Sequence, residues 1–386
     1  MQFLSTVLVA LTAAAGVMGQ GGDANAFATG LLDALRQNNL TQLASAVEAN
    51  AAALLPALAS AGNKTVLAPS NQAIQALGNV DQNTLVNTIA YHVLNGTYKV
   101  DQLMAGQHTI AATALNSSEF VNLPGDRPQV AVLSKAMGNN TAFVYQAGRN
   151  VSFAGAMDGP MYQNILVQPI EQVLMVPGNV SDVAGMIGVS QLVQLLQSAN
   201  LVEALDSMPV TVFAPNNAAI QAAQSTIMAA TPEQQVAVLS NHYIPGSVVY
   251  STAIKDVPSA TSGSGQELKF MANDTGAYVM SGNVTAKIVR TDYVAANGVV
   301  HVIDNVLLNT MNNPAAASSA AASAESAAAT QTAQPGVGTG GNENAGSGMG
   351  GGMGGGSNEN GAMSTAKIGG GAAALAMLAS GMWLLA

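Results

Sequence analysis

TVFAPNNAAI, residues Thr211–Ile220, has a counterpart in TVLAPSNQAI, residues Thr65–Ile74. Each stretch begins with β-branched and apolar residues typical of a strand. Each then has a proline, Pro69 or Pro215, which lacks the backbone N–H that strand pairing needs. The polar residue after the proline offers a side-chain oxygen that can cap a helix. The ten residues therefore predict a strand, its end and the start of a helix, and their repetition predicts two domains of one fold.

Two further landmarks follow in the same order in both copies. His92 lies in IAYHVLNG and His242 in LSNHYIPG, while VQPIEQVLM begins at Val167 and VHVIDNVLL begins at Val300. The separation between copies is 146 residues for the first landmark, 150 for the second and 133 for the third. The first copy therefore has extra residues between its last two landmarks, and we expect them in a loop or hairpin.

The hydrophobic period changes along each copy. Apolar residues recur at helical spacing in residues 27–58 and again in residues 183–205, which predicts two or three helices before each landmark strand. Later segments such as ELKFMAND, AYVMSGN and VTAKIVRTDYV have the short β-rich pattern of hairpins. In VVHVID, alternation places Val299, His301 and Ile303 on one face. Helices followed by strands indicate an α+β fold.

These landmarks together resemble the fasciclin (FAS1) domain over about residues 25–311. The second copy matches closely, with His301 and Asp304 in its last motif, whereas the first copy has Gln168 and Glu171 there. Any role of the histidine and aspartate is therefore in doubt for the first copy. The resemblance implies that each copy is a wedge-shaped β-sandwich flanked by N-terminal helices, as in tandem, lipid-anchored surface proteins of the fungal type. The motif positions that we assign to structure are Thr65, Pro69, Thr211, Pro215, His301 and Asp304.

The two ends of the chain differ in composition from the repeated part. Residues 1–19 hold an apolar run that ends in small residues and predict a signal peptide, with a buried N-terminal helix as the alternative. FAS1-like domains are expected at residues 25–176 and 177–311. Residues 312–360 are rich in Ala, Ser and Gly, have no hydrophobic face and predict a disordered stalk, although the Ala-rich part is also compatible with a helix.

A hydrophobic tail closes the sequence. Asn360 and the small residues after it are followed by a weakly polar spacer and by the apolar residues 372–386. This order is the pattern of a glycosylphosphatidylinositol (GPI) attachment signal, with residues 361–386 as the propeptide and Asn360 or Gly361 as the attachment residue. The alternative is a membrane-spanning tail helix, for which the apolar run is short.

Nine N-x-S/T sequons support export to the cell surface. A single sequon is weak evidence of a glycan, but several in a chain with a signal peptide predict a glycoprotein. They lie at Asn39, Asn63, Asn95, Asn116, Asn139, Asn150, Asn179, Asn273 and Asn283.

Charge and composition exclude several function classes. The 386 residues include 21 acidic and 11 basic side chains, which argues against a nucleic-acid partner. There is no cysteine, so disulfides, thiolate metal sites and cysteine nucleophiles are excluded. The histidines lack a metal-ligand spacing, and the sequence has none of the common hydrolase motifs. We therefore predict a protein without catalytic residues, metal or cofactor.

The histidines beside tyrosines are the only candidates for binding residues. In animal members of the family a Tyr-His motif takes part in integrin adhesion, and Tyr91 with His92 has the same letters. His242 and Tyr243 are the corresponding pair in the second copy. The Asp-Ile adhesion motifs of those proteins have no clear counterpart, so integrin binding is not transferred. Buried histidines that bond backbone groups are the favoured interpretation.

Three function classes remain. The first is a non-enzymatic surface protein that adheres to matrix or cell-wall glycans or proteins, or to a second copy of itself. Its lipid anchor would attach it to the outer face of the plasma membrane, and transfer from there to the cell wall is the alternative location. The second is a structural cell-wall glycoprotein that acts through its glycans. The third is a hydrolase of wall polymers, which the missing motifs disfavour.

Overall fold

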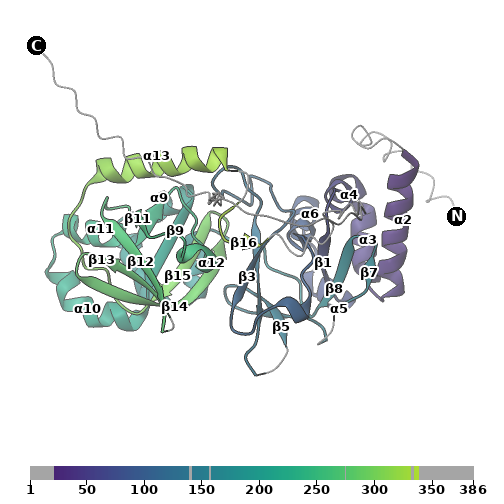
Figure 1. The fold of residues 1–386 in the computed structure, drawn as a ribbon, viewed down its shortest axis with the longest axis horizontal. Helices are drawn as coiled ribbons and strands as arrows, with labels where there is room; N and C mark the ends of the chain where they lie inside the picture. Colours follow the sequence, from purple (N-terminus) through teal and green to yellow (C-terminus); the bar gives the residue numbers. More distant parts are fainter. Residues whose placement is uncertain (1–20, 139–140, 156–157, 274, 332–333, 339–386) are drawn as a thin grey trace, which may run out of the picture. The chain divides into compact units, whose positions relative to one another are not determined.

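The computed structural model describes residues 21–138, 141–155, 158–273, 275–331 and 334–338. The expected signal peptide, the end of the stalk and the GPI signal lie outside these residues. The described residues belong to one compact unit, and Figure 1 shows their order along the chain. We call residues 25–176 the first domain and residues 177–311 the second domain.

The first domain begins with three helices, as its apolar spacing predicts, and two more follow the landmark strand. They are α2 (Gly21–Gln37), α3 (Thr41–Ala49), α4 (Ala51–Leu58), α5 (Asn71–Leu77) and α6 (Gln82–Tyr91), with one 3-10 turn, η2 (Val100–Gln102). Its strands are β1 (Lys64–Pro69), β2 (Val93–Asn95), β3 (His108–Ala112), β4 (Val130–Lys135), β5 (Ala142–Tyr145), β6 (Val151–Ser152), β7 (Met161–Tyr162) and β8 (Ile165–Ile170). Most of the expected extra residues are found in the long connection between β3 and β4.

The second domain repeats the order of helices, landmark strand, helices and hairpins. Its helices are α7 (Val180–Met186), α8 (Ser190–Ser198), α9 (Val202–Ser207), α10 (Asn217–Ala229), α11 (Pro232–Ser240) and α12 (Ser251–Ile254). Its strands are β9 (Val210–Pro215), β10 (Tyr243–Pro245), β11 (Ser259–Thr261), β12 (Glu267–Asn273), β13 (Gly276–Ser281), β14 (Val284–Ala295) and β15 (Gly298–Ile303).

The strands of the two domains are divided into sheets differently. In the second domain all seven strands form one sheet of order β10-β9-β15-β14-β13-β12-β11. Strand β14 connects the two parts of this sheet, because its residues 284–288 pair with β13 and its residues 288–295 pair with β15. In the first domain, β6 pairs with β5 and β7 pairs with β8. Two separate short strands thus make the two pairings that the single strand β14 makes in the second domain. The first domain therefore has two sheets, of order β2-β1-β8-β7 and β16-β3-β4-β5-β6, where β16 (Val337–Gly338) comes from residues after the second domain.

The first and third landmarks pair as parallel strands in both domains. In the first domain Val66 lies opposite Val167, and in the second domain Val212 lies opposite Val300. Strands β1 and β9 end at their prolines, and the next residue caps the following helix by accepting a hydrogen bond from a backbone N–H. The prediction of strand, stop and helix start is confirmed in both copies.

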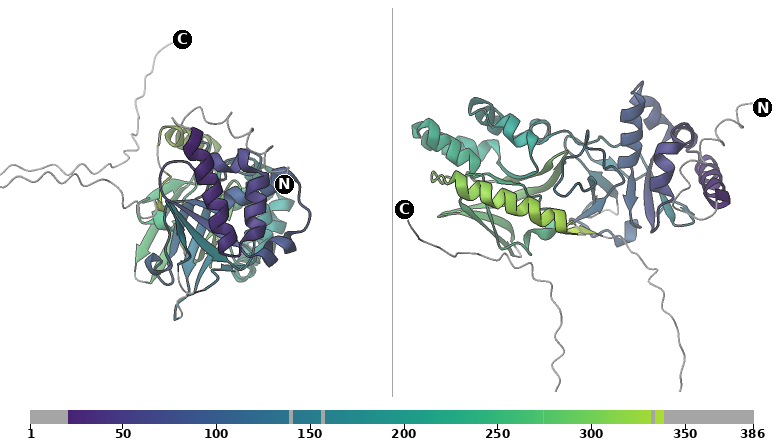
Figure 2. Two further views of the ribbon diagram at one scale, coloured as in Figure 1. Left: turned by 90° about the vertical axis from the view of Figure 1, so that its right-hand side faces the viewer. Right: turned by 90° about the horizontal axis from the view of Figure 1, so that it is seen from above.

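The residues after the second domain continue the fold. Helix α13 (Pro314–Thr330) contacts β10 and β11, and it lies along the second domain in the views of Figures 1 and 2. Strand β16 (Val337–Gly338) then adds to the edge of β3 in the first domain. Gly125 comes so close to α13 that a Cβ atom there would lie 2.7 Å from the Ala328 oxygen. Of the two predictions for the Ala-rich segment, the helix is therefore the correct one, while residues 339–360 lie outside the described residues.

Candidate functional site

The Tyr-His pair of the first domain lies in its core rather than on a surface. Tyr91 and His92 are each 2% exposed. The Leu174 N–H donates to His92 Nε2 (2.9 Å), so Nδ1 carries the proton and donates to the Thr88 oxygen (2.6 Å). Burial lowers the pKa of His92 to about 4. The neutral ring therefore links the end of α6 to the segment after β8 through two hydrogen bonds, and we call this arrangement a histidine tie.

The second domain repeats this tie with His242, which is 3% exposed. Its Nε2 accepts from the Leu307 N–H (2.9 Å), and its Nδ1 donates to the Val238 oxygen (2.7 Å). Burial again lowers the pKa to about 4. Tyr243 is half-buried in β10, where a Cβ atom on Gly263 would meet its ring at 2.2 Å. In all four candidate binding residues, most of the side chain is therefore turned to the protein's own interior.

His301 and Asp304, from the last motif, have separate structural roles. His301 is fully buried: its Nε2 donates to the Val249 oxygen (2.8 Å), its Nδ1 accepts from the Asp292 N–H (3.3 Å), and its ring stacks on Phe213. Asp304 is exposed and accepts a hydrogen bond from the Lys287 N–H (2.7 Å).

In the first domain the position of the motif's histidine belongs to the buried Gln168, and that of its aspartate to the exposed Glu171. Gln168 Oε1 accepts from the Gly159 N–H (3.2 Å), which is a contact of its own rather than a copy of the His301 contacts.

A buried polar cluster that the sequence did not predict forms where the two domains meet. The fully buried Asp292 accepts hydrogen bonds from the Ser251 N–H (2.7 Å), from the Ser251 hydroxyl and from His108 Nδ1 (2.8 Å). Burial alone would raise the pKa of Asp292, but the hydrogen bonds from His108 and Ser251 and the nearby His301 outweigh it, so the pKa lies below its usual value. Asp292 has a positive φ of 60° and lies within β14, where the pairing with β15 shifts register between Arg290 and Tyr293.

The cluster does not have the geometry of a nucleophilic triad. In such a triad the imidazole lies between the serine and the carboxylate, so that it can take the serine's proton. Here Asp292 lies between Ser251 and His108, and both side chains bond to the same carboxylate oxygen. The arrangement ties β3 of the first domain to α12 and β14 of the second, and it leaves the hydroxyl without a base.

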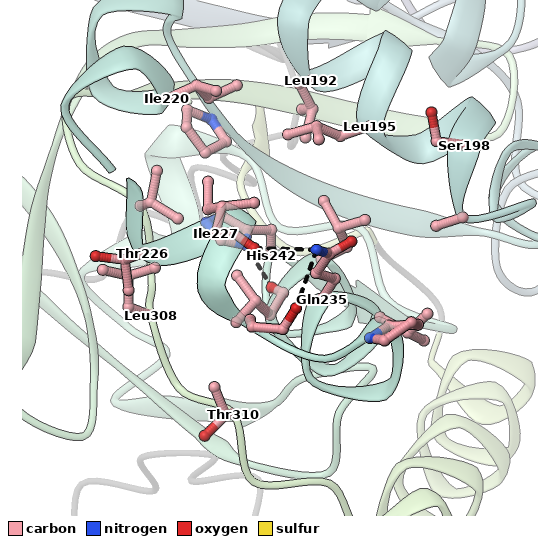
Figure 3. A pocket seen from close by; sticks show the side chains of 18 residues that line it. Leu192, Leu195, Ser198, Ile220, Thr226, Ile227, Gln235, His242, Leu308 and Thr310 are labelled. Atoms are coloured by element: carbon pink, nitrogen blue, oxygen red, sulfur yellow. Dashed lines mark hydrogen bonds between the residues drawn. The ribbon is translucent and has the colours of Figure 1, made fainter. Parts of the chain in front are cut away.

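An apolar pocket of about 290 Å³ opens in the second domain (Figure 3). It lies between α8, α10, α11 and the segment that follows β15, and the His242 ring forms part of its wall. The walls include Leu192, Leu195, Ile220, Ile227 and Leu308, and no Asp, Glu, Lys or Arg is among the described residues that line it.

The sequon asparagines are mostly on the surface. Of the eight that the structure describes, Asn63 and Asn95 are half-buried, and Asn139 lies outside the described residues. The side-chain nitrogen of Asn95 donates to the Thr113 oxygen (3.2 Å), so a glycan there would be attached to a nitrogen that already makes an internal bond. The exposed asparagines are Asn39, Asn116, Asn150, Asn179, Asn273 and Asn283.

In the described part of the chain, no group of three or more His, Asp or Glu side chains is arranged to hold a metal ion. No helix among these residues is both long and apolar enough to cross a membrane. The expected anchor residue and the hydrophobic tail lie outside the described residues.

Comparisons with known proteins agree with the landmarks. A fasciclin-like arabinogalactan protein of Cercospora beticola is 28% identical over 266 residues, which cover 66% of this chain and 70% of that protein. Another, of Phaeosphaeria nodorum, is 26% identical over 255 residues, which cover 64% of this chain and 78% of that protein. A solved FAS1 domain pair from the insect cell adhesion molecule fasciclin I aligns with 71% of this chain and 98% of its own, at 18% identity and a TM-score of 0.36.

The family model of the fasciclin domain matches twice, once in each repeated half. The matched segments are residues 38–151 and 188–309, which together make up more than half of the chain. The chain therefore belongs to the fasciclin domain family and contains two copies of the domain.

Proposed function

We propose that the protein is a non-enzymatic glycoprotein of the cell surface that adheres to extracellular-matrix or cell-wall glycans or proteins, or to a second copy of itself. The observation that carries the proposal is the pair of fasciclin domains, since similar proteins are named as fasciclin-like arabinogalactan proteins. The exposed sequons, which are distributed over both domains, support a glycoprotein.

The internal use of the polar groups supports a role without catalysis. His92, His242 and His301 each use both ring nitrogens in hydrogen bonds to backbone groups. A general base needs a free nitrogen within reach of a substrate. The carboxylate of Asp292 is similarly occupied. Wall-polymer hydrolysis is therefore the weakest of the three hypotheses, and turnover of a panel of glycans and esters by the purified protein would restore it.

In this proposal, attachment of many copies to one membrane makes the overall adhesion strong although each single contact is weak. We place a lipid anchor at Asn360, after removal of residues 361–386, or at Gly361, after removal of the residues that follow it. Many copies tethered to one surface convert modest affinities into avidity, provided that a tether gives each copy reach. Because α13 and β16 are part of the folded unit, we assign the tether to residues 339–360.

Shortening the tether tests the proposal. Cells that display the chain without residues 341–357 should adhere less well than wild-type cells at equal surface density. A matched control replaces the same residues with an equal length of Gly and Ser and should adhere as the wild type does. Adhesion that is unchanged by the deletion would refute the role of tethered avidity.

The exposed sequons also favour the second candidate, a structural wall glycoprotein that acts through its sugars. In that case glycans released from the purified protein should compete with adhesion when they are added in solution. If adhesion depends on the protein surface, the same glycans should have no effect.

A further inference from the structure

We propose that the pocket of the second domain binds a small neutral molecule, an aliphatic chain with an uncharged polar end such as a hydroxyl group. This ligand site is separate from the proposed adhesion, which does not require it.

The lining selects for an aliphatic ligand. The walls include side chains from three helices, among them Leu195 of α8 and Ile227 of α10, which Figure 3 labels. Leu239 of α11 is also part of the lining. Contact with aliphatic walls is favourable in proportion to the apolar area that the ligand removes from water. The described lining offers no charged side chain that could pair with an ionised ligand, and burying an unpaired charge there would be costly.

The polar groups within the walls are already occupied. Both ring nitrogens of His242 bond backbone groups. Gln235 Nε2 donates to the oxygens of Ile227 (3.0 Å) and Ala230 (3.2 Å), which ties the end of α10 to α11. Two exposed lining residues, Thr226 and Thr310, have hydroxyls without a hydrogen bond to other described residues. A ligand's polar end therefore finds its partners at the exposed edge, and its chain lies among apolar groups.

The volume limits the ligand to a short chain. An engineered apolar cavity of about 150 Å³ binds benzene, which has six heavy atoms. In proportion, the volume of about 290 Å³ in this domain takes about twelve heavy atoms. A ten-carbon alcohol has this size.

One wall of the pocket is specific to the second domain. Asp81 and Thr231 cap the corresponding helices α6 and α11. Six residues separate Ile74 from Asp81, whereas ten separate Ile220 from Thr231. With four extra residues in this connection, α10 has 13 residues against 7 in α5. The added turn at its end, residues 224–229, contains Thr226 and Ile227 of the pocket lining. The repeated core of the fold does not need this turn, because the first domain is built without it.

Isothermal titration calorimetry of the full chain with 1-decanol and with decanoate, both at pH 7, tests the proposal. We expect saturable binding of one 1-decanol per chain with a negative heat-capacity change, which is the mark of apolar burial. Decanoate should bind at least tenfold more weakly, because no cationic side chain lines the described pocket. Absence of saturable 1-decanol binding, or equal binding of decanoate, would overturn the proposal.

Two variants locate the site. Ala230→Phe places a ring in the pocket wall and should weaken 1-decanol binding at least tenfold, whereas Ala229→Phe, at the exposed neighbour, should leave it unchanged. A chimera in which residues 223–230 are replaced by the LGNV of residues 77–80 removes the added turn and should also lose binding. Thermal melting identifies variants that do not fold. Wild-type affinity in either folded pocket variant would overturn the assignment.

Discussion

Replacing His242 with glutamine tests the neutral histidine ties that we infer for both domains. The pKa of His242 is about 4 in the folded protein because of burial, against about 6.5 for a solvated histidine. Between these values the unfolded chain binds a proton that the folded chain does not, so stability falls as the pH falls. Each pH unit in this range lowers the free energy of unfolding by about 1.4 kcal/mol. Relative to neutral pH, the free energy of unfolding is therefore lower by about 2 kcal/mol at pH 5 and by about 3 kcal/mol below pH 4.

The assay is urea unfolding of the full chain at several pH values between 7.5 and 4.5, with the transition of each domain fitted separately because a two-domain protein need not unfold in one step. The His242→Gln variant keeps an amide at the position but cannot titrate. It should reduce the slope of unfolding free energy against pH by about 1.4 kcal/mol per unit in the second domain's transition below pH 6.

A loss of packing would shift the unfolding curve of the variant without changing its slope. The matched His92→Gln variant should change only the slope of the first domain's transition, since the equivalent tie lies there. If His242→Gln leaves the slope of the second domain unchanged, the ring titrates alike in both states, and the inference of a buried neutral histidine is wrong.

Three further predictions follow from the contacts. His301→Ala should lower the unfolding free energy of the second domain by about 2 to 6 kcal/mol in urea titration, because the Val249 oxygen and the Asp292 N–H each lose a buried partner at about 1 to 3 kcal/mol. His301→Gln should restore part of this free energy, and equal loss in both variants would argue against these bonds. Arg127→Ala removes the hydrogen bonds to the end of α13, so hydrogen exchange there should become faster while β14 is unaffected; unchanged exchange would show that the side chain does not hold the helix. Trp383 is the only tryptophan and lies in the tail, so mature protein processed as proposed should fluoresce as a tyrosine protein, and tryptophan emission would contradict the processing.

The repeated landmarks were predictable because their signals are local. In β9, the proline that ends the strand and the asparagine that caps α10 are neighbours in the sequence, and each acts on the backbone beside it. Parallel pairing of the first and third landmarks was not predicted from the residues alone, since it joins segments far apart in the chain.

The interdomain cluster and the docking of α13 could not be predicted, because both depend on contacts across long separations. Asp292 lies in an ordinary hairpin segment, and its partners His108 and Ser251 belong to different domains. Helix α13 has Ala and Ser on every side, so its sequence does not reveal the face that packs. Its close approach to Gly125 becomes visible only in three dimensions.

Adhesion after removal of the glycans tests the central claim most directly. Cells that display the full chain would be treated with enzymes that remove N- and O-linked glycans, and their detachment from a wall or matrix surface would be measured under flow. Thermal melting of the released protein would verify that both domains stay folded. If the protein surface makes the contacts, most of the adhesion should persist at equal surface density. Loss of adhesion with both domains folded would contradict the account and assign the contacts to the sugars.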